Sequence, residues 1–370
     1  MSRHRKSDPK WRGEASAEVM AACVPDLGLG PGAAVLVAGE ASPVLLTALE
    51  QAGCASSLWL RRAGSSLAAV ARTWPADGPF AAALLRLPSA KEELDMMLHA
   101  AAARVAPGGA ILVYGANDEG IRSVATRMEP LLGAIETIGQ RAHCRVLLAR
   151  RPQDVPGARA RLADWRQSGQ LEIAGTDRAW VSYPGTFAKG GLDAGTRLLL
   201  AALAPGAPSP PGQLPLAVSK DARILDFGCG TGVIAAHLRA RWPDARIEMT
   251  DWDALAALAA SENVPSAAAY AAAGLKDLDA AKYDLIVSNP PIHDGKAEDY
   301  TVLTRLIAEA PEKLGPKGAL VLVVLGRVPV EEWLGAAFDK VETIAQDARY
   351  RVWCARGPKV KDRPRGRKAE

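Results

Sequence analysis

Short apolar runs alternate with longer helical patterns along most of the 370-residue chain. The runs are rich in Val, Ile and Leu, as expected of strands in a sheet that is covered on both faces. This alternation predicts an α/β fold, and the chain is long enough for two domains of roughly 100–200 residues each. Strands are expected at 33–39, 56–61, 80–87, 110–115, 144–150, 223–228, 246–251, 283–289, 319–324 and 350–355, with helices at 195–204, 232–241, 253–262 and 299–314 in the second half.

The two halves of the chain are alike in sequence. LDMMLHAAAARVAPGGAILVYG (94–115) matches LTRLIAEAPEKLGPKGALVLVV (303–324) in the order of a helix, a turn with proline and glycine, and a strand. Internal duplication of one α/β domain is the preferred explanation, with convergence on a common supersecondary unit as the alternative. A polar, proline-containing segment joins the halves. We therefore predict domains at 1–155 and 171–356, a linker at 156–170 and a basic tail at 357–370.

The composition, with 49% hydrophobic and 23% charged residues, is typical of a folded protein. The net charge of +4 is small, but basic residues gather at both ends of the chain, either as solvated tails or to attract phosphates. The five cysteines lie far apart without CxxC pairs, which favours a reducing compartment over a metal site or disulfides. No apolar h-region follows the charged start, and no apolar run reaches about 18 residues. We expect a cytoplasmic protein without a signal peptide, membrane span or bound metal.

A glycine-rich turn follows one predicted strand in the sequence ILDFGCGTGVIAAHL. Gly228, Gly230 and Gly232 let the backbone turn tightly and approach a ligand, and the next helix presents free N–H groups. A dinucleotide-binding turn would space its third glycine later. Asp226 precedes the glycines and Asp251 ends the following strand, so both carboxylates are expected at one edge of the sheet.

The pattern Asp-x-Gly-x-Gly-x-Gly resembles the first motif of the class I S-adenosylmethionine-dependent methyltransferases. The resemblance implies that the glycines lie against the methionine and ribose of the cofactor, and that Asp226 holds its amino group directly or through water. Asp251 is placed to accept both ribose hydroxyls, with Trp252 on the adenine face; a helix N-cap is the alternative role of Asp251. Residues 272–274 offer no side chain that would read adenine, so backbone contacts are one possibility there.

The sequence SNPPIHDG (288–295) follows another predicted strand. An exocyclic base amine is a poor nucleophile because its lone pair is delocalised into the ring. Two acceptors for the amine protons would localise the lone pair in line with the methyl group. The Asn289 side-chain oxygen and the Pro290 carbonyl can supply them, and the Pro290–Pro291 pair stiffens the turn. A turn that merely closes the strand is the alternative.

SNPPIHDG resembles SNPPFHDG of the ribosomal RNA small subunit methyltransferase C family, guanine-N2 methyltransferases related to the large subunit methyltransferase G group. GLDAGTRLLL (191–200) and YRVWCAR (350–356) resemble further stretches of that family. Its members carry two tandem class I methyltransferase-like domains, Rossmann-like in fold, of which the first has lost its cofactor loop. VLVAGEASP (35–43) stands here where the glycine loop would be, as a degenerate first domain predicts.

The resemblance also implies the roles of the site residues. Thr196 has an N-cap as its alternative role, and His293 could instead satisfy turn backbone. Ile292 departs from the family, whose aromatic ring would stack on the flipped base, an interaction worth roughly 1–3 kcal/mol. The implied catalytic residues are Asn289, Pro290 and Pro291; the implied substrate-binding residues are Ile292, His293 and Asp294; and the implied cofactor-binding residues are Asp226, Gly228, Gly230, Gly232, Asp251, Trp252, Gly195 and Thr196.

The sequence therefore predicts an enzyme that uses S-adenosylmethionine to methylate the N2 amine of a guanine in ribosomal RNA, with the small subunit favoured. The first domain is expected to bind or orient RNA, and the partner is ribosomal RNA or a ribosomal subunit, with the enzyme acting as a monomer. One alternative is N-methylation of transfer RNA, DNA or a protein glutamine. The other is a non-catalytic RNA-binding or ribosome-assembly protein with a relict cofactor site.

Overall fold

The computed structural model describes residues 9–64, 70–186, 192–204, 218–279, 282–291, 293–294 and 297–359. The first half of the chain forms one α/β domain. Its elements are α1 (Pro9–Cys23), η2 (Val24–Leu27), β1 (Ala34–Ala38), α2 (Pro43–Gln51), β2 (Ala55–Trp59), β3 (Phe80–Arg86), α3 (Lys91–Ala102), β4 (Val105–Ala116), η3 (Asn117–Glu119), η4 (Ile121–Ser123), α4 (Ala125–Leu132), β5 (Ile135–Arg141) and β6 (Cys144–Arg150).

A short connection and a hairpin lead into a second α/β domain. The connection holds η5 (Leu162–Trp165), and the hairpin consists of β7 (Gln167–Ile173) and β8 (Thr176–Ser182). The second domain contains α5 (Ala194–Ala202), β9 (Arg223–Phe227), α6 (Val233–Arg241), β10 (Arg246–Asp251), α7 (Ala254–Asn263), β11 (Ala268–Ala271), η6 (Leu275–Asp277), β12 (Tyr283–Ser288), β13 (His293–Asp294), β14 (Ala297–Glu298), α8 (Thr301–Lys313), β15 (Leu314–Leu325), α9 (Val330–Ala337), β16 (Phe338–Gln346) and β17 (Tyr350–Pro358).

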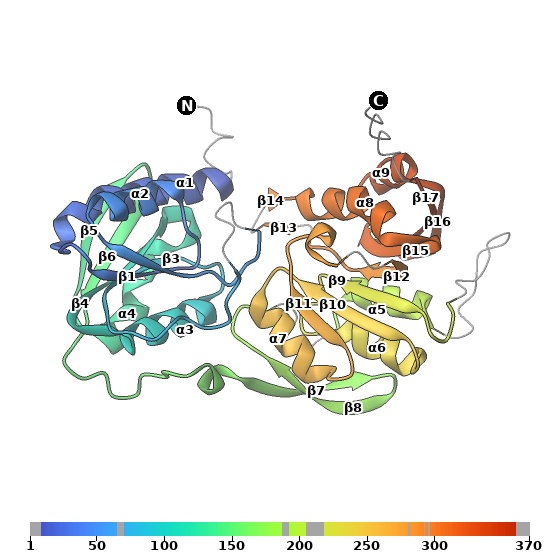
Figure 1. Cartoon of the computed structure of the whole chain (residues 1–370), viewed down its shortest axis with the longest axis horizontal. Helices are drawn as coiled ribbons and strands as arrows, with labels where there is room; N and C mark the ends of the chain where they lie inside the picture. The colour runs from blue at the N-terminus through green and yellow to red at the C-terminus, as the bar shows by residue number, and fades with distance from the viewer. Residues whose placement is uncertain are drawn as a thin grey trace, which may run out of the picture.

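Each domain is built on one twisted sheet, and the two domains lie side by side (Figure 1). The first sheet has the strand order β2-β1-β3-β4-β6-β5, and the second has the order β11-β10-β9-β12-β15-β17-β16. In each sheet one strand, β6 or β17, runs antiparallel to both neighbours, while the remaining pairs are parallel. The second domain thus repeats the first and adds β11 at its edge.

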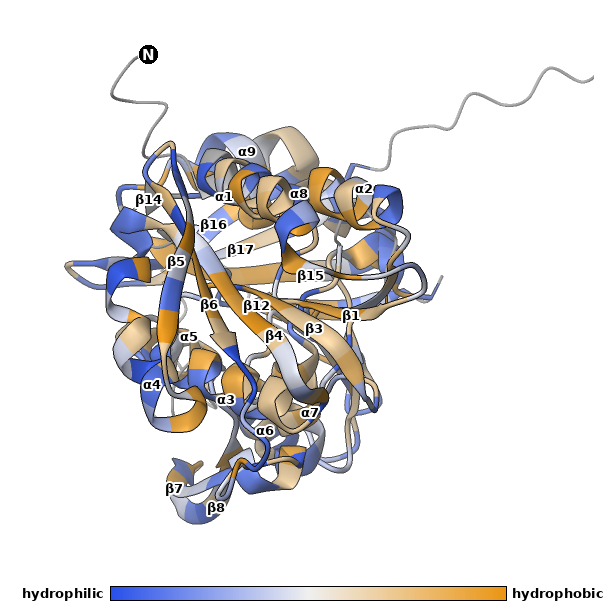
Figure 2. Cartoon of the chain, turned by 90° about the vertical axis from the view of Figure 1, so that its left-hand side faces the viewer, coloured by the Kyte–Doolittle hydropathy of each residue, from blue (hydrophilic) through white to orange (hydrophobic). Residues whose placement is uncertain are grey.

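Helices cover both faces of each sheet, as in doubly wound folds. In the first domain α1 and α2 pack on one face, with α3 and α4 on the other. In the second domain α5, α6 and α7 cover one face, and α8 and α9 cover the other. The central strands are therefore buried on both sides and coloured mainly as hydrophobic, as β3, β12 and β15 show in Figure 2.

The registers of the two sheets match in detail. β3 pairs with β4 at Phe80–Val105 and again at Ala82–Ala110, and β12 pairs with β15 at Tyr283–Leu314 and again at Leu285–Ala319, with the same irregularity between the two pairs. In each sheet this irregularity coincides with the turn that contains proline and glycine and that aligns between 94–115 and 303–324. A Cβ on Gly109 or on Gly318 would lie 2.7 or 2.8 Å from a carbonyl oxygen of the neighbouring strand, so both turns need glycine. This agreement supports internal duplication.

The strands predicted from apolar runs are all present, with bounds that differ by a few residues. The elements that the sequence did not predict include α1, α2, α4, β5, the β7–β8 hairpin, β16 and α9. β5 and β16 lie at sheet edges, and their exposed polar residues break the continuous apolar pattern. Among the described residues, no helix has both the length and the apolar character that a membrane crossing requires.

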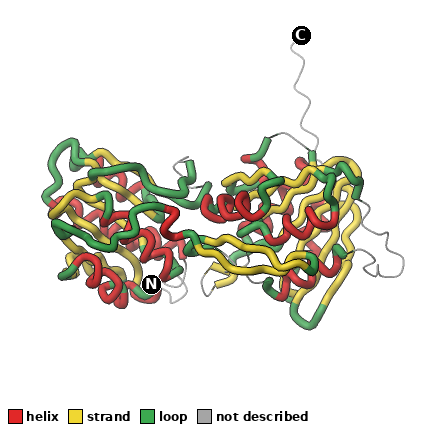
Figure 3. The backbone as a smooth tube through the Cα atoms, turned by 90° about the horizontal axis from the view of Figure 1, so that it is seen from below, coloured by secondary structure: helices red, strands yellow, loops and turns green. Residues whose placement is uncertain are grey.

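The segment between the domains is more structured than a plain linker. Residues 156–170 include η5 and the first residues of β7, and Trp165 is buried in the core of the first domain. The β7–β8 hairpin then runs from the junction along the second domain (Figure 3). At the other end, β17 continues through Pro358, into the predicted tail. Residues 3–6 and 360–370, which carry most of the terminal basic charge, lie outside the described residues.

Candidate active site

Three neighbouring parallel strands bring the predicted site residues to one edge of the second sheet. Phe227 of β9 pairs with Thr250 of β10 on one side and with Ser288 of β12 on the other. Asp226, Asp251 and Asn289 each lie within one residue of these aligned positions. The chain winds in opposite directions from β9, so this edge is the topological switch point at which doubly wound sheets bind ligands.

The glycine turn leaves β9 through left-handed backbone conformations. Gly228, Gly230 and Gly232 have φ angles of 70°, 53° and 89°. The N–H groups of Gly228 and Cys229 donate to the Thr250 carbonyl at 2.8 and 2.9 Å, which ties the turn to β10. A Cβ on Gly228 would meet no atom within 4 Å, whereas one on Gly232 would lie 3.2 Å from Ala260 of α7. Gly228 therefore borders open space. Gly232, at the start of α6, permits α6 and α7 to pack closely.

Asp226 is fully buried and only half satisfied. Its Oδ2 accepts a hydrogen bond from the Ala235 N–H at 3.0 Å, while its Oδ1 has no partner among the described residues. Burial raises the pKa of Asp226 to about 7, the Asp251 charge adds to this, and the Ala235 N–H opposes it. A buried carboxylate oxygen without a donor is costly unless a ligand supplies one. The predicted role of Asp226, which is to hold the amino group of S-adenosylmethionine directly or through water, would supply a donor to this oxygen.

Asp251 fixes the glycine turn and the loop that follows β10. Its Oδ2 accepts from the Gly230 N–H and its Oδ1 from the Asp253 N–H, both at 2.9 Å. Its alternative role as N-cap of α7 is wrong, because Asp253 is the cap and accepts from the Leu255 N–H at 2.9 Å. Burial raises the pKa of Asp251 to about 6. Trp252 lies beside it with 48% of its surface exposed.

Asn289 is held by two residues at the start of α5. Its Nδ2 donates to Asp193 Oδ1 at 3.3 Å, to Asp193 Oδ2 at 3.1 Å and to Thr196 Oγ1 at 2.8 Å. A carboxylate can only accept, so this contact fixes which end of the amide is nitrogen. The Asn289 Oδ1 thereby remains available as an acceptor, as the predicted role of Asn289 needs.

Asp193 was not predicted as a site residue. It is the N-cap of α5 and accepts from the Thr196 N–H at 3.0 Å and from the Thr196 hydroxyl at 2.7 Å. The N-cap role considered for Thr196 is therefore wrong. A Cβ on Gly195 would lie 3.1 Å from both Asp193 Oδ1 and the Tyr350 ring, so Gly195 lets these groups approach. An aspartate just before an apolar helical pattern was the sequence signal for the cap.

The rest of the Asn-Pro-Pro segment is described in part. Pro290 is buried and Pro291 is exposed. Ile292 lies outside the described residues, and His293 and Asp294 form β13, which pairs with β14, without described side chains. The part of the chain that the structure describes holds no cluster of three or more His, Cys, Asp or Glu side chains arranged to bind a metal.

The first domain carries different residues at the equivalent positions. In the first domain Val35 pairs with Ala82, and in the second Ile224 pairs with Leu285 in the same way. When these two pairs are aligned, Val37 stands at the position of Asp226, and Arg86 stands at the position of Asn289. The β1–β2 and β9–β10 registers likewise place Leu60 at the position of Asp251. Arg86 is buried there and pairs with Glu119 at 2.5 Å. The first domain thus lacks the carboxylates and the amide of the second.

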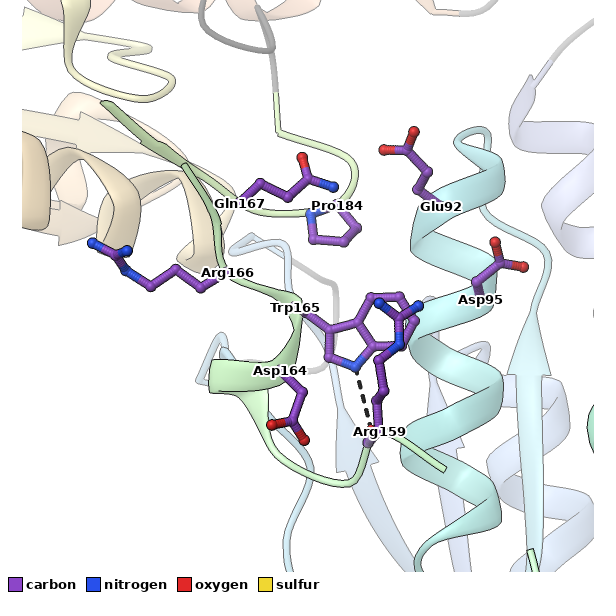
Figure 4. A pocket seen from close by; sticks show the side chains of 8 residues that line it. All are labelled: Glu92, Asp95, Arg159, Asp164, Trp165, Arg166, Gln167 and Pro184. Carbon is purple, nitrogen blue, oxygen red and sulfur yellow. Dashed lines mark hydrogen bonds between the residues drawn. The ribbon is translucent and has the colours of Figure 1, made fainter. Parts of the chain in front are cut away.

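A separate pocket of about 350 Å³ lies at the junction between the domains (Figure 4). Arg159 covers the Trp165 ring at 3.2 Å, and the indole N–H donates to the Arg159 carbonyl. The pocket carries charges of both signs and contains none of the predicted site residues. Its lining consists of Glu92, Asp95, Arg159, Asp164, Trp165, Arg166, Gln167 and Pro184.

Two family models and several relatives match this chain. The methyltransferase small domain matches residues 178–354, and its N-terminal counterpart matches residues 31–168. Ribosomal RNA small subunit methyltransferase C of Alteromonas mediterranea is 34% identical over 74% of this chain and 72% of the relative. The protein of the same name from Chromohalobacter salexigens is 31% identical over 80% of this chain and 90% of the relative.

A solved structure shares the fold of both domains. It is the T. thermophilus 16S rRNA N2 G1207 methyltransferase in complex with AdoMet and guanosine, which is 22% identical to this chain, with a TM-score of 0.77. The match covers 92% of this chain and 91% of that one. The chain is therefore built from two tandem methyltransferase-like domains, and it belongs to the ribosomal RNA small subunit methyltransferase C family.

Proposed function

We propose that this protein transfers the methyl group of S-adenosylmethionine to the N2 amine of a guanine in small-subunit ribosomal RNA. Family membership supports the reaction class and the RNA substrate. The observation that carries the proposal for this chain is the clamp of Asp193 and Thr196 on Asn289, next to a buried, half-satisfied Asp226. We propose further that the protein acts in the cytoplasm as a monomer on free ribosomal RNA or a ribosomal subunit.

The second domain holds the cofactor in this proposal. Asp226 binds its amino group, the turn with Gly228 and Gly230 lies along it, and Asp251 accepts from its ribose hydroxyls. S-adenosylmethionine supplies an electrophilic methyl group on a sulfonium. Removal of water from this edge of the sheet strengthens each of these polar contacts.

Asn289 and Pro290 orient the target amine. The Asn289 Oδ1 and the Pro290 carbonyl accept the two N2 protons, which directs the nitrogen lone pair toward the methyl group. Asp193 and Thr196 restrain the Asn289 amide, so that the acceptor is in place before the base arrives. The N2 atom forms the new bond to carbon, and the sulfonium–methyl bond breaks. The extra proton then leaves the nitrogen, so no general base is needed.

Mass mapping of ribosomal RNA tests the substrate. A strain that lacks this protein is expected to lose one N2-methylguanine from its small-subunit RNA, and a plasmid-borne copy should restore it. An Asn289→Ala copy should not restore it, although the protein accumulates normally. An unchanged methylation pattern in the deletion strain would refute the proposed substrate, and transfer RNA from the same strain would then be mapped.

Asp193→Asn tests the clamp without removing the helix cap, because Asn and Asp cap helices equally well. The new amide nitrogen would face the Asn289 Nδ2, so two hydrogen-bond donors would oppose each other and the clamp would be lost. We expect kcat to fall by up to about 100-fold, as a small misplacement of a catalytic group can cost that much. The Kd for S-adenosylmethionine should stay unchanged, and the unfolding midpoint should fall only slightly because the helix cap is retained. A kcat equal to that of the wild type would rule out the positioning role of Asp193.

A further inference from the structure

The segment that follows β2 in the first domain lies directly on the cofactor loop of the second. The Ala63 N–H donates to the Trp252 carbonyl at 2.7 Å, and the Ala254 N–H donates to the Arg61 carbonyl at 2.9 Å. Arg62 and Asp253 thereby form an isolated antiparallel bridge. The contact joins backbone to backbone, so it fixes the position of this loop relative to the first domain.

The bridge joins equivalent positions of the duplicated domains. Leu58 pairs with Val37 in the first domain as Met249 pairs with Asp226 in the second, so Leu58 and Met249 are equivalent. Arg62 and Asp253 each lie four residues further along the chain and are therefore equivalent as well. The two hydrogen bonds around the bridge are likewise equivalent to each other. The domains therefore meet here through the same local surface on both sides, as in a two-fold symmetric interface.

Arg61 reaches the loop through its side chain as well. Only 3% of the side chain is exposed, and its Nε and Nη2 hold the Asp253 carboxylate at 3.2 and 2.6 Å in a bidentate pair. Arg61 also donates to the Pro184 carbonyl at 2.9 Å. Asp253 in turn donates its N–H to Asp251, so Arg61 is linked to the ribose-binding carboxylate through one residue.

Arg62 lies beside the proposed adenine face. Its guanidinium is 5.8 Å from the centre of the Trp252 ring, and its Nη2 pairs with Glu93 at 3.2 Å. Its side chain is 31% exposed. Burial raises the pKa of Asp251, and the charge of Arg62 opposes that rise, so Arg62 favours the ionised carboxylate that accepts from hydroxyls.

Gly64 contacts the second loop of the cofactor site. A Cβ on Gly64 would lie 2.5 Å from the Ala273 Cβ, so only glycine permits this approach. Ala273 belongs to the stretch 272–274, in which no side chain was found to read adenine. The Ala272 N–H donates to the Asp251 carbonyl at 2.8 Å, which joins the two loops.

We propose that residues 61–64 of the first domain form one wall of the S-adenosylmethionine site, with Arg61 and Arg62 as positioning residues for Asp251 and Trp252. The inference rests on the proposed placement of the cofactor in the second domain. It gives the degenerate domain a role at the nucleoside end of the cofactor, in addition to the binding of RNA.

Arg62→Gln tests the wall in the full-length protein. Arg127→Gln is the matched control, because Arg127 also belongs to the first domain, forms one ion pair, with Asp95 at 2.6 Å, and is 34% exposed. Calorimetry should show a Kd for S-adenosylmethionine that rises about three- to tenfold for Arg62→Gln, as loss of a cation–π contact and its charge predicts, and less than about twofold for the control. Arg62→Lys retains the charge and should recover most of the affinity.

Methylthioadenosine separates a positioning role from a general loss of structure. This ligand lacks the amino-acid part of the cofactor, so Arg62→Gln should weaken its binding by the same factor. Asp226→Asn should weaken S-adenosylmethionine and leave methylthioadenosine unchanged. Equal affinities of the Arg62→Gln and Arg127→Gln proteins for both ligands would overturn the inference.

Gly64→Ala provides an independent test of the same wall. Its φ angle of 83° strains any other residue, and Gly133, with a φ of 79° and no atom within 4 Å of its Cβ position, is the matched control. Gly133→Ala introduces the same backbone strain without a steric clash, whereas Gly64→Ala adds the clash with Ala273. Gly64→Ala should therefore weaken both ligands, and Gly133→Ala should leave both affinities unchanged. If the wild type binds the cofactor but methylates no guanine, the proposed function fails and this test still applies. If the wild type does not bind it, both proposals fail.

Discussion

The burial of Asp226 and its proposed role in cofactor binding favour opposite protonation states. The residue is buried in the apolar base of the turn, which favours its neutral form and raises its pKa to about 7. The amino group of the cofactor needs the ionised form. In the absence of ligand, the folded state thus binds a proton more tightly than the unfolded chain does. The contribution of Asp226 to the free energy of unfolding falls as the pH rises from about 4 to 7.

The same linkage predicts how cofactor affinity depends on pH. Only ionised Asp226 pairs with the ammonium group, so the Kd for S-adenosylmethionine should decrease as the pH rises toward 8. Below a pKa of about 7, affinity should fall about tenfold per pH unit. Calorimetry between pH 6 and pH 8, in buffers of different ionisation enthalpy, should also detect proton release on binding. Asp226→Asn is the control. It should bind weakly, and its profile should change only with the ionisation of Asp251, whose pKa is about 6. Equal wild-type affinities at pH 6 and pH 8 would contradict this account.

Sequence reasoning found the residues that end strands, and also Thr196, but it missed Arg61 and Asp193. Asp226, Asp251 and Asn289 each follow an apolar run, so their common edge could be predicted from the α/β pattern. Arg61 had no such signal, because its partner Asp253 is far away in the chain and the contact depends on how the domains dock. Asp193 had a local signal, the cap, but its contact with Asn289 is likewise non-local.

At the scale of elements, the β7–β8 hairpin is tied to the glycine turn. The Trp180 indole N–H donates to the Thr231 hydroxyl at 3.0 Å. Asn263, at the end of α7, donates to the carbonyls of Val181 and Thr231, both at 2.9 Å, and accepts from the Val181 N–H at 2.8 Å. One amide thus joins a hairpin, a helix and the turn. Four successive residues of β7 are exposed, so the hairpin lacks the apolar run that would have predicted a strand.

Asn263→Ala is expected to loosen this connection. The substitution leaves one N–H and two carbonyl groups without their partner, and we expect the free energy of unfolding to fall by about 2–4 kcal/mol. Urea denaturation measures the loss, and calorimetry should show weaker cofactor binding because the turn is less restrained. Ser168→Ala on the same hairpin removes an exposed contact with Arg166 and should change stability by less than about 0.5 kcal/mol. Similar stabilities of the two variants would show that the Asn263 hydrogen bonds are not needed.

At the scale of the whole molecule, the two domains share part of a hydrophobic core as well as a fold. Leu255 and Ala259 of α7 are fully buried and pack with apolar residues of α3, η5 and β8 in the first-domain cluster. The duplication predicted two similar domains, and the structure has them. It did not predict that a helix of the second domain would complete the core of the first. That contact arises from docking, which no periodicity within either half encodes.

A shared core predicts that both sheets lose stability together. Leu255→Ala should lower the free energy of unfolding by about 2–5 kcal/mol, because it leaves a cavity at the junction. Leu45 is equally buried but lies in α2, on the face of the first sheet away from the second domain. Hydrogen exchange should show that Leu255→Ala and Leu45→Ala each reduce protection in β3 and in β9, since a cooperative unit opens as a whole. If the domains were independent, Leu45→Ala would reduce protection in β3 and leave β9 unchanged. Because α7 carries Asp253 at its start, such coupling would also transmit damage in the first domain to the cofactor loop.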